Sequence, residues 1–232
     1  MAPHPLQPLS DLVDLFLPRR CSACDRGLRP QERALCLHCL EDLPLTRFHD
    51  DPKNPVALAF AGRIPVVSAT ALLRFDGSGR VQRILHRLKY RGDTGVGHEL
   101  GLMLGEQLTR SASFQGVDAV LAVPLHPAKE RSRGYNQSQV IAEGIRAAWP
   151  LTDVRGSVRR VVRTNSQTRM DREQRWSNVS DAFLVRRPEA VRDRHVLLVD
   201  DVITTGATIG SLARTLTSLP GTTVSVVALA HA

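Results

Sequence analysis

An apolar run that stops at two adjacent carboxylates constrains the fold of this chain more than any other feature. The segment HVLLVDDVITTGATIG, residues 195–210, begins like a β-strand, reaches Asp200 and Asp201, and then becomes a turn rich in threonine. A short continuous apolar run is typical of a parallel strand that is buried on both faces. Because open parallel sheets bind ligands at the carboxyl ends of their strands, the two acids are expected at a ligand site.

Strand and helix patterns alternate along much of the chain. The expected strands cover residues 66–75, 117–124, 158–163, 181–185, 195–200 and 222–230. The expected helices cover residues 8–17, 79–92, 98–111, 136–149 and 207–219. This alternation predicts an α/β fold, with a mostly parallel sheet flanked by helices.

The cysteines and prolines divide the 232 residues into three parts. All four cysteines fall within residues 1–43, where we expect a helix and a small cysteine module. Residues 44–65 are rich in proline, which is typical of a linker or an irregular wrap. The alternating pattern fills residues 66–232, the expected main domain.

The turn after the acids has the composition of a phosphate-binding turn. It leads into the N-terminus of the next helix, where free backbone amides and the helix dipole favour a phosphate. Threonine hydroxyls can donate to phosphate oxygens, whereas ionised carboxylates only accept and therefore suit ligand hydroxyls or a metal. A ribose 5-phosphate group fits both features, because its hydroxyls can donate to the acids and its phosphate can bind the turn. The alternative is an ordinary capped helix beside acids that are only solvated. The residues expected to hold this ligand are Asp200, Asp201, Thr204, Thr205, Gly206, Ala207 and Thr208.

Basic segments elsewhere are candidates for the same pocket. A turn at the end of another apolar strand is expected at the same sheet edge, and it consists of Pro124, Leu125 and His126. The residues Lys129, Arg131 and Arg133 add positive charge beside this turn. The segment KYRGD places Lys89 and Arg91 where they could contact a phosphate or a second substrate. The alternative is that the basic residues of KYRGD only stabilise the C-terminal end of a helix, where positive charge is favourable.

The compartment follows from what the sequence lacks. No apolar run approaches the roughly 18 residues of a membrane helix, and the N-terminal stretch has no basic region of the signal-peptide kind. We expect a cytoplasmic protein without membrane insertion, in which cysteines stay reduced. The net charge of +8 makes anionic ligands the first to consider.

Two Cys-x2-Cys pairs predict a structural zinc site. Four thiolates can surround one tetrahedral Zn²⁺ and leave no open position for catalysis. The alternative is a redox-active dithiol pair. Arginines flank the pairs, so the module permits contact with nucleic acid. Modules of this kind also hold proteins or domains together without contacting nucleic acid. The expected ligands are Cys21, Cys24, Cys36 and Cys39.

The string DDVITTGAT closely resembles the PRPP-binding signature of type I phosphoribosyltransferases. The resemblance implies that the acids hold the ribose 2- and 3-hydroxyls, that the turn holds the 5-phosphate, and that residues 124–126 form the pyrophosphate loop. An arginine-rich segment is similar to the flexible loop of glutamine amidophosphoribosyltransferases, which would close over pyrophosphate; a solvated loop is the alternative. The matching positions are Arg163, Thr164, Gln167, Arg169 and Arg175.

The order of five motifs resembles the ComF family, phosphoribosyltransferase-like proteins linked to natural competence. The motifs are CxxC…CxxC, KYRGD, RGYNQS, TNSQ…R…N and LLVDDVITTGAT. The resemblance implies a type I phosphoribosyltransferase fold, PRPP binding with Mg²⁺, structural zinc, and single-stranded DNA or the competence helicase machinery as partners. No feature indicates an oligomeric state.

Three activities remain open on the sequence alone. The chain could be an enzyme that transfers phosphoribosyl to an acceptor, with Asp200 and Asp201 orienting the ribose. It could be a PRPP sensor without turnover. It could also be a DNA-binding competence adaptor, although two acids oppose a bare DNA phosphate in that pocket.

Overall fold

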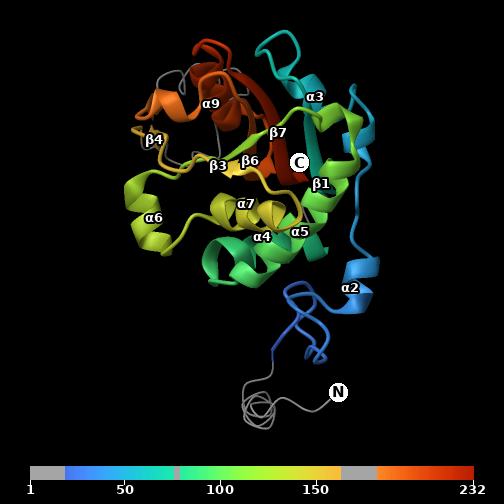
Figure 1. The fold of residues 1–232 in the computed structure, drawn as a ribbon. Coiled ribbons are helices and arrows are strands. Elements are labelled where there is room, and N and C mark those ends of the chain that lie inside the picture. Colours follow the sequence, from blue (N-terminus) through green and yellow to red (C-terminus); the bar gives the residue numbers. More distant parts are fainter. Residues whose placement is uncertain (1–18, 76–78, 163–181) are drawn as a thin grey trace, which may run out of the picture.

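A five-stranded parallel sheet forms the centre of the molecule (Figure 1). The computed structural model describes residues 19–75, 79–162 and 182–232. The strand order is β1 (Ala69–Arg74), β7 (Thr223–His231), β6 (His195–Ile203), β2 (Ala119–Ala122) and β3 (Thr152–Asp153). The predicted α/β class with a mostly parallel sheet is therefore confirmed.

The central strands are buried on both faces, as their apolar composition predicts. Alternate residues of β6 belong to two different hydrophobic clusters: Leu197 and Val199 pack on one side, Val196 and Leu198 on the other. The first cluster is completed by α4 (Gly79–Tyr90), α5 (Thr94–Arg110) and α7 (Gln137–Ala148). The second is covered by α9 (Ala207–Thr217) and α3 (Pro55–Phe60).

Several short elements were not predicted. They are α2 (Leu37–Glu41), α3, α6 (Pro127–Arg133), the edge strand β3, and the 3₁₀ turns η1 (Phe48–Asp50), η2 (Ala112–Phe114) and η3 (Pro188–Ala190). Both α3 and α6 begin with proline at the first helical turn, after the caps Asn54 and His126. The expected strands near 158–163 and 181–185 form a separate antiparallel ribbon of β4 (Val158–Arg160) and β5 (Phe183–Val185). The expected helix at 8–17 lies outside the described residues.

Glycines let α5 and α7 pack with their backbones in contact. A Cβ added at Gly101 would lie 2.3 Å from the Ile141 carbonyl oxygen, and one at Gly144 would lie 2.3 Å from the His98 carbonyl oxygen. Because α7 also packs on β2 and β6, this contact fixes the N-terminus of α7 beside the carboxyl end of the sheet.

The cysteine module, described from residue 19 to 43, packs on α4 and α5 at the bottom of Figure 1. The Glu99 carboxylate accepts hydrogen bonds from the backbone amides of Ala34 (2.9 Å) and Leu35 (3.2 Å). Ser22 donates its hydroxyl to Asp93 at 2.5 Å. The buried cysteines share one hydrophobic cluster with the helices, so module and main domain are packed as one body.

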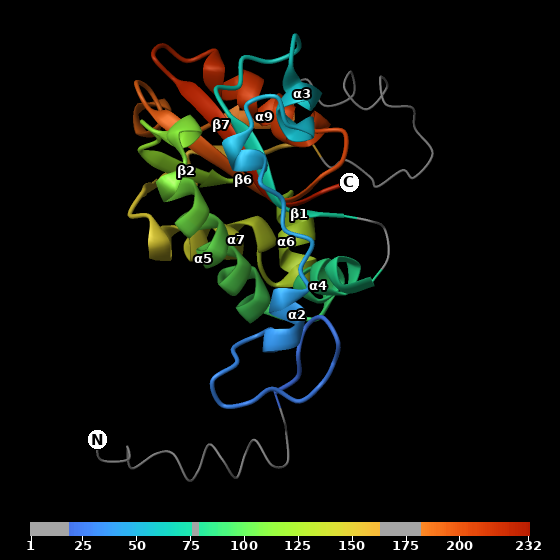
Figure 2. The ribbon, with the colours of Figure 1, turned by 90° about the vertical axis from the view of Figure 1, so that its right-hand side faces the viewer.

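The proline-rich segment 44–65 runs from the module along β1 to α3 (Figure 2). The Thr46 amide donates to the Leu72 carbonyl at 2.8 Å, and the Arg74 amide donates to Pro44 at 2.9 Å. The segment thereby covers part of the exposed edge of β1, where unpaired backbone groups are otherwise a liability. None of the helices described in Figures 1 and 2 has the length and apolar character needed to cross a membrane.

Candidate functional site

Two acids at the carboxyl end of β6 make different contacts. Asp200 accepts a hydrogen bond from the Ser138 hydroxyl at 2.9 Å and another from the Asp201 amide at 2.9 Å. The Asp201 side chain is only 7% exposed, and its Oδ2 lies 3.0 Å from Lys89 Nζ. That contact is an ion pair without the geometry of a directed hydrogen bond. Asp201 therefore keeps a buried oxygen with unused capacity to accept.

The surroundings of Asp200 disfavour its charged form. Burial raises its pKa most, and the neighbouring charge of Asp201 raises it further, to about 7. The hydrogen bonds from the Asp201 amide and Ser138, and the charge of Lys89, act in the opposite direction. A ligand that donates hydroxyl protons or brings a cation to Asp200 would favour the ionised form.

The turn after β6 leaves the N-terminus of α9 open. Gly206 has a left-handed backbone, with φ of 74°, and offers no capping side chain; the Thr205 hydroxyl accepts one long hydrogen bond, of 3.4 Å, from the Ala207 amide. The first amides of any α-helix lack intrahelical acceptors, so this terminus can receive an anion. A cavity of about 70 Å³ lies here, and it is lined by Asp200, Val202, Ile203, Thr204, Thr205, Gly206, Ala207, Thr208 and Ile209. The structure thus brings Asp200 and the predicted phosphate-binding turn to one cavity, while Asp201 lies beside it in the chain and does not line it.

Phe60 of α3 packs behind this turn. A Cβ added at Gly206 would lie 2.9 Å from the Phe60 ring. The glycine is therefore required both for its backbone conformation and for the close approach of the ring. Sequence reasoning missed this support because α3 lies in the proline-rich segment, although Asn54 followed by Pro55 is a recognisable helix start.

Four cations from three elements gather on the side of the acids where Lys89 pairs with Asp201. Burial lowers the pKa of Lys129 most, and the charges of Arg133, Arg160 and Lys89 lower it further, while Asp201 opposes them. Burial also lowers the pKa of Arg160, and the charge of Asp200 opposes that shift. Lys89 lies on α4, Lys129 and Arg133 on α6, and Arg160 on β4. This arrangement suits a polyanion beside the acids.

Ser138 and Arg160 were not predicted as site residues. Ser138 is 62 positions from its partner Asp200 in the sequence, and Arg160 sits in a segment that reads as a plain strand. Ser138 lies in the first turn of α7, where its amide donates to the capping side chain of Asn136 at 3.0 Å. No pattern along the chain indicated that the serine also reaches the acid.

The other predicted residues lie at varying distances from the acids. Pro124 and Leu125 line a neighbouring cavity of about 390 Å³, which also contains Arg160. His126 caps α6 by accepting from the Ala128 amide at 3.2 Å. Arg91 is exposed just after α4. The expected loop residues Arg163, Thr164, Gln167, Arg169 and Arg175 lie outside the described residues.

The four cysteines form one cluster. Their sulfur atoms all lie within 4.8 Å of one another, and Cys24 and Cys36 are 3.8 Å apart. A tetrahedral zinc with Zn–S bonds of 2.3 Å requires sulfurs about 3.8 Å apart, whereas a disulfide requires about 2 Å. A hydrogen bond from the Arg26 backbone lowers the pKa of Cys24 to about 6, and burial raises that of Cys39 to about 12. The cluster is consistent with the predicted zinc site.

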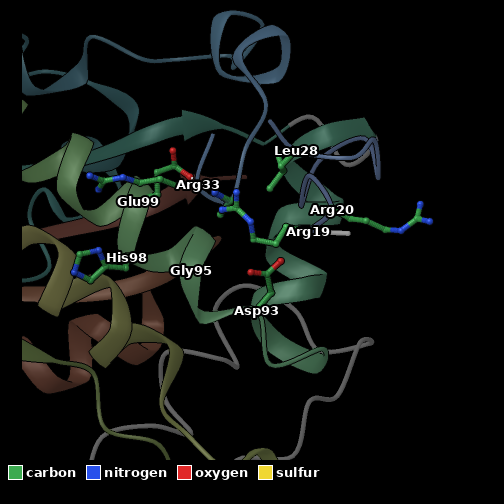
Figure 3. Close-up of a pocket in the computed structure, with 9 residues that line it drawn as sticks. Arg19, Arg20, Leu28, Arg33, Asp93, Gly95, His98 and Glu99 are labelled. Carbon is green, nitrogen blue, oxygen red and sulfur yellow. Dashed lines mark hydrogen bonds between the residues drawn. The ribbon is translucent and has the colours of Figure 1, made fainter. Parts of the chain in front are cut away.

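A third cavity, of about 530 Å³, lies between the cysteine module and the start of α5 (Figure 3). Arg19, Arg33 and His98 contribute basic groups, while the acids Asp93 and Glu99 are already engaged by the module. In Figure 3 the Arg20 side chain extends away from the other residues. The cavity is thus a basic surface at the junction of module and main domain.

Comparison with known proteins identifies relatives along most of the chain, although no family profile matches it. DNA utilization protein YhgH of Salmonella typhimurium is 28% identical over 213 residues, which cover 89% of this chain and 87% of that protein. Competence protein F of Haemophilus influenzae is 28% identical over 222 residues, covering 91% and 90%. The chain is therefore similar, over most of its length, to proteins of the ComF family. The resemblance to this family that the motifs indicated is thereby confirmed.

Two more distant matches complete the comparison. Competence protein ComFC of Bacillus subtilis is 26% identical to this chain over 137 residues, covering 59% of it and 53% of the relative. A solved structure of the allosteric regulatory enzyme of purine biosynthesis covers 61% of this chain and 29% of its own, with 19% identity and a TM-score of 0.40.

Proposed function

We propose that this protein binds PRPP with Mg²⁺ at the carboxyl end of β6 and transfers its phosphoribosyl group to an acceptor, with release of pyrophosphate. We further propose that this activity serves the uptake or use of DNA in the cytoplasm. The observation that carries the proposal is one juxtaposition: Asp200 and Asp201 adjoin the open N-terminus of α9, and four cations lie beside them. Relatives called competence protein F and DNA utilization protein support the second part.

The proposed binding mode divides PRPP into three parts. The ribose hydroxyls donate to Asp200 and Asp201, which can accept through oxygens not fully used by protein donors. The 5-phosphate accepts from the amides and threonine hydroxyls of the turn around Gly206. The pyrophosphate lies among the cations Lys89, Lys129, Arg133 and Arg160.

The cations would also favour the chemical step. When the acceptor attacks C1 of the ribose, the C1–oxygen bond breaks and its electron pair leaves with pyrophosphate. Positive groups fixed beside the leaving group stabilise the charge that grows on it. The two carboxylates fit Mg²⁺, which prefers oxygen ligands and would neutralise part of the pyrophosphate charge.

Calorimetric titration with PRPP and Mg²⁺ tests the pocket. We expect binding to wild type and loss of binding in the Asp200→Asn, Asp201→Asn double variant. A double variant at exposed acids, Asp42→Asn with Asp51→Asn, matches the change in charge and should bind like wild type. Absence of binding by folded wild-type protein would refute the PRPP proposal.

Pyrophosphate release, measured in the same samples, separates an enzyme from a sensor. Release of pyrophosphate in the presence of an acceptor supports the transferase. Tight PRPP binding without release of pyrophosphate, whichever acceptor is added, supports a sensor.

A DNA-binding adaptor is the second candidate, and the basic cavity at the module junction favours it. Binding to nucleic acid through such a surface should weaken steeply with salt. An adaptor would bind single-stranded DNA equally well after Asp200→Asn and Asp201→Asn, but not after Arg19→Ala and Arg33→Ala.

A further inference from the structure

Tyr90 is an aromatic residue placed on the surface at the edge of the proposed pocket. It is the last residue of α4 and is 68% exposed. The other described aromatic rings, namely Phe48, Phe60, Phe75, Phe114, Tyr135, Trp149 and Phe183, are buried or half-buried. A single exposed apolar side chain is ordinary, so what matters for Tyr90 is which groups surround it.

The ring of Tyr90 is held in place by basic neighbours. The Arg133 guanidinium lies over the ring, 5.4 Å from its centroid, and the His86 ring lies 5.1 Å away at a tilt of 47°. Arg133 also donates to the side chain of Gln137, which is only 5% exposed at the start of α7. The platform of Tyr90 and Arg133 is thus fixed by a buried residue while most of the tyrosine stays open.

The same neighbours connect the platform to the acids. Lys89, adjacent to Tyr90, forms the ion pair with Asp201. Arg133 belongs to the group of cations that acts on Lys129 together with Lys89. The end of α4 is anchored by the Tyr135 hydroxyl, which donates to the Leu88 carbonyl. The ring therefore belongs to the same basic neighbourhood as the cations beside Asp201.

We propose that Tyr90, backed by Arg133, is the stacking platform for the acceptor, and that this acceptor carries a nucleobase ring. The inference rests on the proposed function and names its substrate class. A planar heteroaromatic ring stacks on tyrosine, and guanidinium groups add favourable contacts with π systems. A ring nitrogen of the base would form the new bond to C1 as the bond to pyrophosphate breaks, and its proton would pass to water.

Product-like ligands test the platform directly. Ribose 5-phosphate offers only the diol and the phosphate, whereas AMP and UMP add a base at C1. Base stacking on an aromatic side chain corresponds to a gain in affinity of about 5- to 150-fold. We expect AMP or UMP to bind wild type more tightly than ribose 5-phosphate by a factor in this range. The ratio should fall towards one in Tyr90→Leu and persist in Tyr90→Phe and Tyr90→Trp.

The outcomes distinguish this inference from the proposed function. If ribose 5-phosphate and PRPP both fail to bind, the proposed function is wrong and the platform falls with it. If ribose 5-phosphate binds but the base adds nothing, or if Tyr90→Leu keeps the full ratio, the platform alone is wrong. A third arm uses a 5′-phosphorylated oligothymidylate, which lacks the ribose diol. Loss of its binding in Tyr90→Leu with an unchanged nucleotide ratio would make Tyr90 a DNA contact and overturn the acceptor proposal.

Discussion

At the scale of single residues, Gly206 carries two constraints that can be separated by experiment. Both Gly206 and Gly134 have left-handed backbones, with φ of 74° and 86°, but only Gly206 has a neighbour within 4 Å of an added Cβ. The left-handed conformation costs a non-glycine residue about 1–2 kcal/mol, and the clash with Phe60 adds to it. We expect Gly206→Ala to destabilise the protein more than Gly134→Ala in urea unfolding, and to abolish PRPP binding.

The Phe60→Leu background supplies the control for Gly206. Leucine lacks the ring carbons that approach the added methyl group, so the difference between the two glycine variants should shrink there. Equal losses for Gly206→Ala and Gly134→Ala in the wild-type background would mean that the ring does not constrain the turn.

Asp200 predicts a pH-dependent stability that disappears in Asp200→Asn. Its folded pKa of about 7 lies above the ordinary value of 3.8. The folded state therefore holds a proton that the unfolded state releases, and the corresponding stability is lost as pH rises through about 7. We expect the melting temperature of Asp200→Asn, relative to wild type, to increase from pH 5 to pH 8.

The exposed variant Asp42→Asn serves as the reference in that melting series, because it removes one carboxylate far from β6. A constant difference between Asp200→Asn and wild type over this pH range would contradict the raised pKa. An increase would mean that the acid is retained at a cost in stability, as is common for functional groups.

At the scale of elements, the contact between α5 and α7 determines where Ser138 lies. A methyl group at Gly144 would meet backbone atoms of α5 at 2.3 Å, whereas one at Gly95 meets only side chains, at 3.6 Å or more. Overpacking costs about 1–3 kcal/mol, while alanine at an unhindered helical glycine gains roughly 0.5–1 kcal/mol. We expect Gly144→Ala to lower the midpoint of urea unfolding and Gly95→Ala to raise it. Similar effects of the two substitutions would show that the helices can separate without loss.

The long elements could be predicted from the sequence because their patterns are strong. β6, β7, α4 and α9 each bury a periodic or continuous apolar set, and their existence follows from that alone. The apolar run that stops at Asp200 also located the candidate site, since parallel strands present ligands at that edge, although β6 itself continues to Ile203.

The short elements could not be predicted because their stability comes from partners far along the chain. Phe60 is buried only because α3 packs behind the turn at Gly206. Strand composition does not reveal that β4 pairs with β5 outside the main sheet. Arg160 was therefore interpreted as an ordinary strand residue, although its charge lowers the pKa of Lys129 beside the acids.

At the scale of the whole molecule, α4 connects the cysteine module to the acids. Arg83 donates to the Ala23 carbonyl of the module, and Arg87 pairs with Asp25. Two residues further along the same helix, in its last turn, Lys89 pairs with Asp201. A rigid helix held at both places can transmit a shift of the module to the site, because its core residues pack in one cluster with the cysteines.

Removal of zinc should therefore affect the ligand pocket as well as stability. Chelation of a metal held by four cysteines frees the module to unfold, and α4 then loses its contacts with Ala23 and Asp25. We expect chelation to lower both the melting temperature and the affinity for PRPP, and zinc to restore both. In Lys89→Met the effect of chelation on affinity should be smaller, because the connection between helix and acid is already broken. A fall in melting temperature with unchanged affinity would mean that the module stabilises the fold without positioning α4, and the basic cavity of Figure 3 would then be the part of the module left to explain.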